Sequence, residues 1–307
     1  MQMDRKTYRS DLCLLLCGTL VWLLADAGRV RTAVSEALSL CAGTVIPALF
    51  PFMTVSGMLV SLGFGQWLSP YLAGFMGPLF RLPGSAASAL LLGFAGGYPI
   101  GARTAADLYR EGLLTKAETE RLLTFCNNSN PAFLISVLGI GVFGDVRTGV
   151  WLWLIHILSA LLTGCILCAG KTVPSRAVPK EFPQQAASFS SAFVGAVGRA
   201  ASGMLSVCAF VVVFYVVALP LREMGGTAAT VLTGMLELFS LTPRLTADGF
   251  GFLLAAFCSG WGGFSVLAQT AAVLEDAGLS PRPAFAGKLL QALLSLALAV
   301  PVYFLVL

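Results

Sequence analysis

Three asparagines and a serine stand in a row inside a very apolar chain: Asn127, Asn128, Ser129 and Asn130, directly before Pro131. Asparagine amides both donate and accept hydrogen bonds, so such a run suits the hydroxyls or base edges of a small solute, and amide oxygens can help to hold Na⁺. A capped loop at a membrane edge is the alternative that these residue types leave open.

The surrounding chain indicates that this polar run lies in a membrane. Of the 307 residues 57% are hydrophobic and 11% are charged, and the mean hydropathy is +0.85. A membrane-spanning helix needs about 20 apolar residues. Long stretches nearly free of charge cover 12–25, 45–64, 84–102, 131–143, 150–169, 203–221, 249–274 and 284–307.

These stretches predict one all-α, polytopic membrane domain over 1–307. We expect seven to nine membrane segments, some of which do not cross fully. In lipid, a break in a helix is tolerated only where protein or a water-filled cavity surrounds it. The polar run is therefore expected to line a pocket.

Helix signals on both sides of the run support a break. Thr115 and Glu118 form a capping-box pattern, which predicts a helix over 116–126. Asn130 can then cap the next helix, with Pro131 as its first residue. Upstream, the glycines and proline of 96–99 free the backbone and open another helix. The N-termini of both new helices favour an anion or a carbonyl-rich solute.

The chain divides into two similar halves. The segment 171–187 contains three prolines and three basic residues and reads as a linker, which separates a first repeat, 35–145, from a second, 188–307. The stretch FAGGYPIG at 94–101 resembles FCSGWGGF at 257–264, and this pairs Gly97 with Gly260. Interrupted apolar segments in corresponding positions are typical of transporter binding sites, so we favour inverted repeats.

The second half has no counterpart of the asparagine run, and its nearest amide is Gln291. After the linker, 188–202 reads as an interfacial helix that precedes a separate span over 203–221. Near the N-terminus, three basic residues precede 12–25, which we expect to be an uncleaved first span rather than a signal peptide.

Further polar side chains could complete a pocket. Ser265 and Gln269 are four residues apart in the second half, where they either line the pocket or bridge helices. Arg103 and Asp107 have the same spacing and either form a pair within one helix or take part in ion coupling.

Two other polar residues lie within apolar segments. Glu237 is interpreted as an interfacial acid, with a proton-coupling carboxylate as the alternative. His156, the only histidine, is expected to hydrogen-bond to a neighbouring helix rather than to relay protons.

The composition also excludes several functions. The net charge of +4 is spread without a basic stripe, so no nucleic acid partner is expected. HExxH, P-loop and GxSxG motifs are absent, so the sequence does not predict an enzyme. We expect no metal and no cofactor, with Na⁺ or H⁺ only as a coupling ion.

Four stretches carry a family resemblance: PALFPF at 47–52, GGYPIGA at 96–102, NSNP at 128–131 and WGGFSVLAQ at 261–269. They resemble the YlbJ family of sporulation integral membrane proteins, which belongs with proteins that carry the nucleoside-recognition, or Gate, domain. The resemblance covers about residue 35 to the C-terminus. It implies a role linked to spore formation and transport of a solute.

The sequence therefore predicts a multi-pass permease of the bacterial cytoplasmic membrane. It would move a small polar solute, nucleoside-like or ion-coupled, and a homo-oligomer is compatible with it. A scaffold or assembly factor for the spore envelope or cortex is the alternative. The expected solute-binding residues are Gly97, Tyr98, Pro99, Asn127, Asn128, Ser129, Asn130, Gly260, Ser265 and Gln269, with Arg103 and Asp107 as coupling residues.

Overall fold

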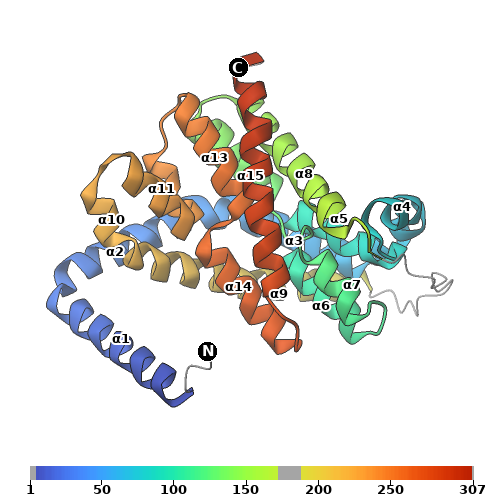
Figure 1. Cartoon of the computed structure of the whole chain (residues 1–307), viewed down its shortest axis with the longest axis horizontal. Helices are drawn as coiled ribbons and strands as arrows, with labels where there is room; N and C mark the ends of the chain where they lie inside the picture. Colours follow the sequence, from blue (N-terminus) through green and yellow to red (C-terminus); the bar gives the residue numbers. More distant parts are fainter. Residues whose placement is uncertain (1–4, 172–187, 306–307) are drawn as a thin grey trace.

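The computed structural model describes residues 5–171 and 188–305, and every regular element in these ranges is a helix (Figure 1). Five segments are long and apolar enough to cross a bilayer: Ala27–Leu59, Val146–Cys168, Phe189–Val217, Gly249–Asp276 and Arg282–Leu305. The prediction of an all-α polytopic membrane protein is confirmed. The predicted linker lies outside the described residues, apart from Lys171.

A bent helix pair forms either a sixth, broken span or a re-entrant loop. Gly74–Phe80 and Gly84–Gly96 pass the same test only together, and they meet at 95°. Three shorter apolar helices cover Asp11–Ala25, Ala132–Val142 and Gly226–Leu236. At 1.5 Å per residue, an α-helix of such length reaches only part of the way across a hydrocarbon core about 30 Å thick. Of the expected segments, 131–143 is therefore too short to cross fully, whereas 12–25 lies within the 21-residue helix Arg5–Ala25.

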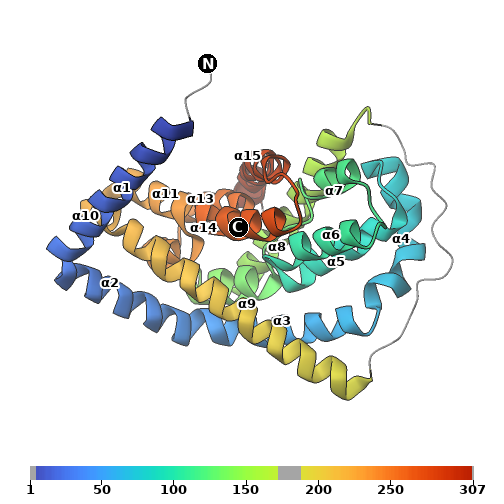
Figure 2. The same ribbon diagram turned by 90° about the horizontal axis from the view of Figure 1, so that it is seen from below.

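Long helices form one side of the molecule (Figure 2). Helix α1 (Arg5–Ala25) leads into α2 (Ala27–Leu40), the short π-helix η1 (Cys41–Val45) and α3 (Ile46–Ser61), and α9 (Phe189–Val217) runs beside α2 and α3. The expectation of an interfacial helix separate from the following span is wrong, because α9 is one continuous helix. No proline interrupts its 29 residues.

The first interruption is a helical hairpin. After α4 (Phe64–Phe80) and the 3₁₀ turn η2 (Gly84–Ala86), helix α5 (Ala87–Gly96) reverses into α6 (Ile100–Arg110), and the two helices pack together. Gly97 has φ +78°, a conformation that favours glycine. A Cβ atom there would lie 2.9 Å from that of Asn130, so the tip of the hairpin lies against the asparagine run.

The second interruption is the asparagine run itself, which follows α7 (Lys116–Leu122). The capping box of Thr115 and Glu118 is confirmed. Asn130 Oδ1 accepts a hydrogen bond from the Phe133 N–H at 2.8 Å, which confirms the predicted cap. The π-helix η3 (Ala132–Val142) then leads to α8 (Val146–Cys168), which Asp145 caps.

The second half is built differently. Short helices α10 (Leu219–Met224), α11 (Gly226–Leu236), α12 (Leu238–Leu241) and η4 (Thr242–Arg244) precede α13 (Gly249–Trp261), α14 (Gly263–Asp276) and α15 (Arg282–Leu305). The break falls at Gly262, with φ +85°, and not at Gly260, which lies within α13. Whereas α5 folds back on α6, α13 and α14 continue as one 28-residue segment. The inverted-repeat arrangement stays a prediction.

Close packing around the asparagine run makes a test of the fold possible. A Cβ on Gly101 of α6 would lie 2.0 Å from the Cys126 carbonyl oxygen, whereas one on Gly74 of α4 meets nothing within 4 Å. We expect Gly101→Ala to lower the free energy of unfolding by about 1–3 kcal/mol through overpacking. Gly74→Ala should leave it unchanged or raise it by up to about 1 kcal/mol, because alanine is the better helix former. Denaturant unfolding of both purified variants measures the difference, and equal stability would contradict this packing.

Candidate functional site

In the interior, the α5–α6 hairpin and the asparagine run of the first half meet the α13–α14 break of the second half. The Tyr98 hydroxyl, at the tip of the hairpin, donates a hydrogen bond to the Ser259 carbonyl of α13 at 3.2 Å. A Cβ on Gly262 would lie 3.2 Å from the same hydroxyl oxygen. Asn127 Nδ2 donates to Thr270 Oγ1 of α14 at 2.7 Å. The hairpin, the asparagine run and the α13–α14 break therefore form one continuous polar region.

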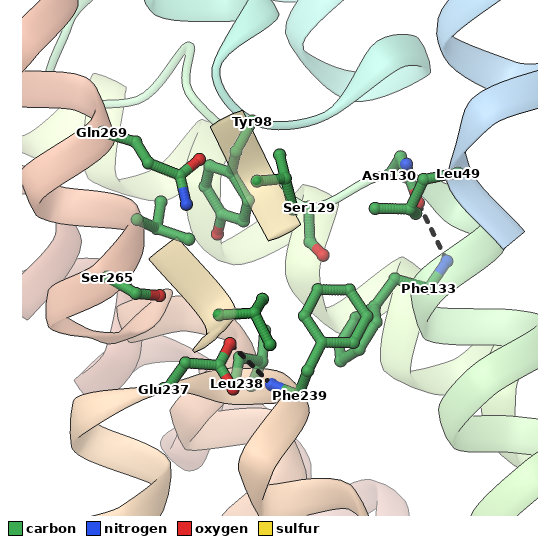
Figure 3. A pocket seen from close by; sticks show the side chains of 13 residues that line it. Leu49, Tyr98, Ser129, Asn130, Phe133, Glu237, Leu238, Phe239, Ser265 and Gln269 are labelled. Carbon is green, nitrogen blue, oxygen red and sulfur yellow. Dashed lines mark hydrogen bonds between the residues drawn. The ribbon is translucent and has the colours of Figure 1, made fainter. Parts of the chain in front are cut away.

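A small cavity lies within this region (Figure 3). Polar and apolar side chains from both halves line it, among them Tyr98, Ser129, Asn130, Phe133, Glu237, Leu238, Phe239, Ser265 and Gln269. The space open to the centre of a water molecule is about 40 Å³. Since one water needs about 10–15 Å³ on this measure, the cavity has room for a few waters or one small ion.

Several polar groups at this cavity lack a protein partner. Among the described residues, no hydrogen bond engages the hydroxyls of Ser129 and Ser265, the amide of Gln269 or the amide nitrogen of Asn130. Figure 3 shows Ser265 and Gln269 on one side of the cavity and Asn130 on the other. Buried polar groups are usually hydrogen-bonded to protein or water. These groups are thus available to a solute, an ion or water.

Glu237 also lines the cavity, so its interpretation as an interfacial acid is wrong. Its side chain is buried, and its carboxylate accepts hydrogen bonds from the backbone N–H groups of Phe239 and Ser240. These bonds cap the four-residue helix α12. The sequence pattern around Glu237 did not reveal this cap, because glutamate is not among the preferred N-cap residues.

Asn127 and Asn128 point away from the cavity into a hydrogen-bonded network. Asn128 Nδ2 donates to the Phe125 carbonyl at 2.7 Å, and its Oδ1 accepts from Gln291 Nε2 of α15 at 3.1 Å. The backbone N–H of Ser129 donates to His156 Nε2 at 3.0 Å. The expected hydrogen bond of His156 therefore forms, with the run as its partner.

Lys288 of α15 belongs to this network, and the sequence reasoning missed it. Its side chain is 2% exposed. Nζ donates to Gln291 Oε1 at 2.7 Å, to the Tyr98 hydroxyl at 3.1 Å and to the Asn127 carbonyl at 3.3 Å. A lysine three residues before a glutamine, within the otherwise apolar stretch 284–307, was the signal that could have found it.

The remaining expected residues lie around the site without lining it. Gly97 allows close contact with Asn130, and a Cβ on Gly260 would lie 2.7 Å from Ser295 Oγ. Both glycines bring protein elements together. Pro99 instead lines a separate cavity between α3, α6 and α9.

Arg103 and Asp107 line that same separate cavity, on the exposed face of α6. Asp107 pairs with Arg110 at 3.1 Å, so the alternative of an Arg103–Asp107 pair is wrong, and the coupling role of these two residues stays a prediction. Within the described ranges, no three His, Cys, Asp or Glu side chains gather as a metal site.

The sequence of this chain is similar to one family model and to one protein of known name. Residues 42–146 match the family model described as nucleoside recognition, or Gate. The chain is also similar to the sporulation integral membrane protein YlbJ of Bacillus subtilis (strain 168). The two are 27% identical over 296 residues, and the match covers 83% of this chain and 72% of the relative. The expected resemblance is confirmed. No solved structure matches the chain.

The Gate match covers only part of the site. It includes the α5–α6 hairpin and the asparagine run, whereas Glu237, Ser265, Gln269 and Lys288 come from the second half. The cavity and the network therefore form where the Gate region meets α8, α9 and the elements from Glu237 to α15.

The contact between the run and α15 predicts energetic coupling. Asn128→Ala and Gln291→Ala should each lower the free energy of unfolding by about 1–3 kcal/mol, because each leaves a buried partner unsatisfied. The double variant should lose less than the sum, with a coupling energy of about 0.5–3 kcal/mol. Gln291→Ala combined with Ser39→Ala, at an exposed site on α2, serves as the additive control. Additivity of the Asn128 and Gln291 variants would exclude this contact.

Proposed function

We propose that the protein moves a small polar solute across the bacterial cytoplasmic membrane through the cavity between the two halves. The observation that carries the proposal is the set of buried polar groups at this cavity that lack protein partners: Ser129, Asn130, Ser265 and Gln269. A transporter site of this kind is expected where interrupted helices meet. These unpartnered hydroxyls and amides suit a hydrogen-bonding solute, and the Glu237 carboxylate that lines the same cavity is engaged by two backbone N–H groups.

The size of the cavity supports a closed state. Sites for drug-sized ligands measure about 300–1,000 Å³, and the present space is far smaller than a nucleoside needs. A nucleoside would require the α5–α6 hairpin to move away from α14, whereas an ion or a very small solute would fit with little motion. Alternating access by motion of one half against the other supplies such an opening.

The name of the similar protein supports a proposal about the cellular process in which this chain acts. Because the similar protein is described as a sporulation integral membrane protein, we infer a role in sporulation for this chain. The solute would serve spore formation, and Na⁺ or H⁺ would be the only coupling ion. Enzymatic activity is not part of the proposal.

One observation favours the alternative, a scaffold or assembly factor that transports nothing. The side chains of Asn127 and Asn128 are fully engaged by protein groups, as a purely structural role requires. The two functions differ at Ser129, whose hydroxyl faces the cavity. A transporter must expose this position to water during its cycle.

Cysteine accessibility distinguishes these functions. In a chain whose native Cys13, Cys17 and Cys165 are replaced by serine, we expect Ser129→Cys to react with a small methanethiosulfonate reagent from at least one side of the membrane. Asn128→Cys should stay inert, because this position is 0% exposed and its side chain is bonded to protein. Equal inertness of both cysteines in sealed vesicles would favour the scaffold.

Solute binding gives a second prediction. A thermal-shift screen of the purified chain with nucleosides, amino acids and divalent metals should find a stabilising compound. For that compound, Ser265→Ala and Gln269→Leu should each weaken binding by about tenfold or more, the loss expected for one hydrogen bond of about 1.4 kcal/mol. Ser39→Ala is the control, and uptake into proteoliposomes should follow binding. Unchanged affinity in both cavity variants would reject this cavity as the site.

A further inference from the structure

The network behind the cavity holds a buried cation. Lys288 lies in the second turn of α15. Its Nζ reaches three oxygen atoms from three different parts of the fold: Tyr98 at the hairpin tip, Asn127 in the polar run and Gln291 on its own helix. The side chain also extends over the Tyr98 ring, with Nζ 5.1 Å from its centre. No other side chain of the described residues hydrogen-bonds to the hairpin, the run and α15 at once.

The hydrogen-bond directions identify the form of the amine. The Asn127 carbonyl and Gln291 Oε1 can only accept. The Tyr98 hydroxyl uses its proton toward the Ser259 carbonyl, so it must accept from Lys288. Three donated bonds require three N–H groups, which only the ammonium form provides. A neutral amine could keep all three contacts only by accepting from the Tyr98 hydroxyl, which would then give up its hydrogen bond to the Ser259 carbonyl.

The ammonium has oxygen ligands but no counter-ion. Among the described residues, the salt bridges involve other side chains, and no carboxylate contacts Lys288. The titratable groups near it are Tyr98, Cys126 and His156. A carbonyl, an amide oxygen and a hydroxyl form the kind of ligand set that replaces the water shell of a small monovalent cation.

We propose that the Lys288 ammonium is a resident, tethered cation of the solute site. It fills an oxygen-lined position that a free Na⁺ would otherwise take, and it holds the hairpin tip and the polar run against α15. This inference rests on the proposed function for its role in transport, and it makes an external Na⁺ unnecessary for the closed state. Lys288 acts through Tyr98 and Asn127 as a positioning residue.

Chemical complementation tests the proposal on the full-length protein. Lys288→Ala should lower the melting temperature by on the order of 10 °C, because the cavity and the unsatisfied oxygens together remove several kilocalories per mole. Propylammonium, which matches the atoms removed, should restore most of the loss when present from membrane extraction onward. Tetramethylammonium, which has no N–H groups, should not.

Two variants serve as controls. Lys288→Met fills the space with an uncharged side chain and should not respond to propylammonium. Lys116→Ala removes an exposed lysine whose Nζ has one carbonyl contact at 3.4 Å, and it should neither lose much stability nor respond.

The wild-type chain supplies a measurement that does not depend on folding of a variant. Its melting temperature should be the same in sodium, potassium and choline chloride at equal ionic strength, unless Na⁺ binds at the cavity as a coupling ion, in which case Ser265→Ala and Gln269→Leu should abolish the difference. A Na⁺-specific stabilisation that persists in both cavity variants, or absence of rescue in a folded Lys288→Ala variant, would overturn the proposal. Because these readouts need no solute, selective rescue together with unchanged solute binding in the Gln269→Leu variant would uphold the tethered cation and reject the proposed function.

Discussion

A break in a helix inside a membrane protein leaves backbone groups that lipid cannot satisfy, and this constraint organises the whole interior. The segment from Cys126 to Asn130 is irregular and buried. Glycines of α5, α6 and α15 allow its backbone to approach closely, since a Cβ on Gly93, Gly101 or Gly287 would lie within 2.0 Å of a backbone oxygen of Cys126 or Thr124. Side chains of α8, α14 and α15 then meet its polar groups.

The polar run serves two purposes because its first two side chains point away from the cavity and its last two face it. Asn127 and Asn128 bind α14 and α15, whereas Ser129 and Asn130 face the cavity. Buried polar networks rigidify a protein only when their members are satisfied. The satisfied half of the run therefore fixes the position of the half that stays open to a solute. A site built on this plan can be irregular and still be rigid.

Local signals in the sequence were sufficient for much of the first half. The capping box at Thr115, the cap at Asn130 and the helix break around Gly97 depend on neighbours within a few residues, and all three are present. Lys288 could not be placed in this way. Its role depends on which helices lie opposite, and an apolar stretch with one charge gives no information about its partner. Glu237 caps α12 through neighbours two and three residues away, but glutamate is not a preferred N-cap residue, so the pattern did not predict a cap. The shift of the second break to Gly262 has the same origin, because Gly260 is needed for packing against α15.

The two halves meet as complements rather than as copies. The first half contributes a hairpin and a broken helix, both of which leave acceptor oxygens without partners of their own. The second half contributes α15, which is unbroken and therefore has a free helical face on which Lys288 and Gln291, three residues apart, point in nearly the same direction. Had α15 carried its own polar break, this pair would have lost its spacing. The absence of a second asparagine run is thus what allows one helix to satisfy the first.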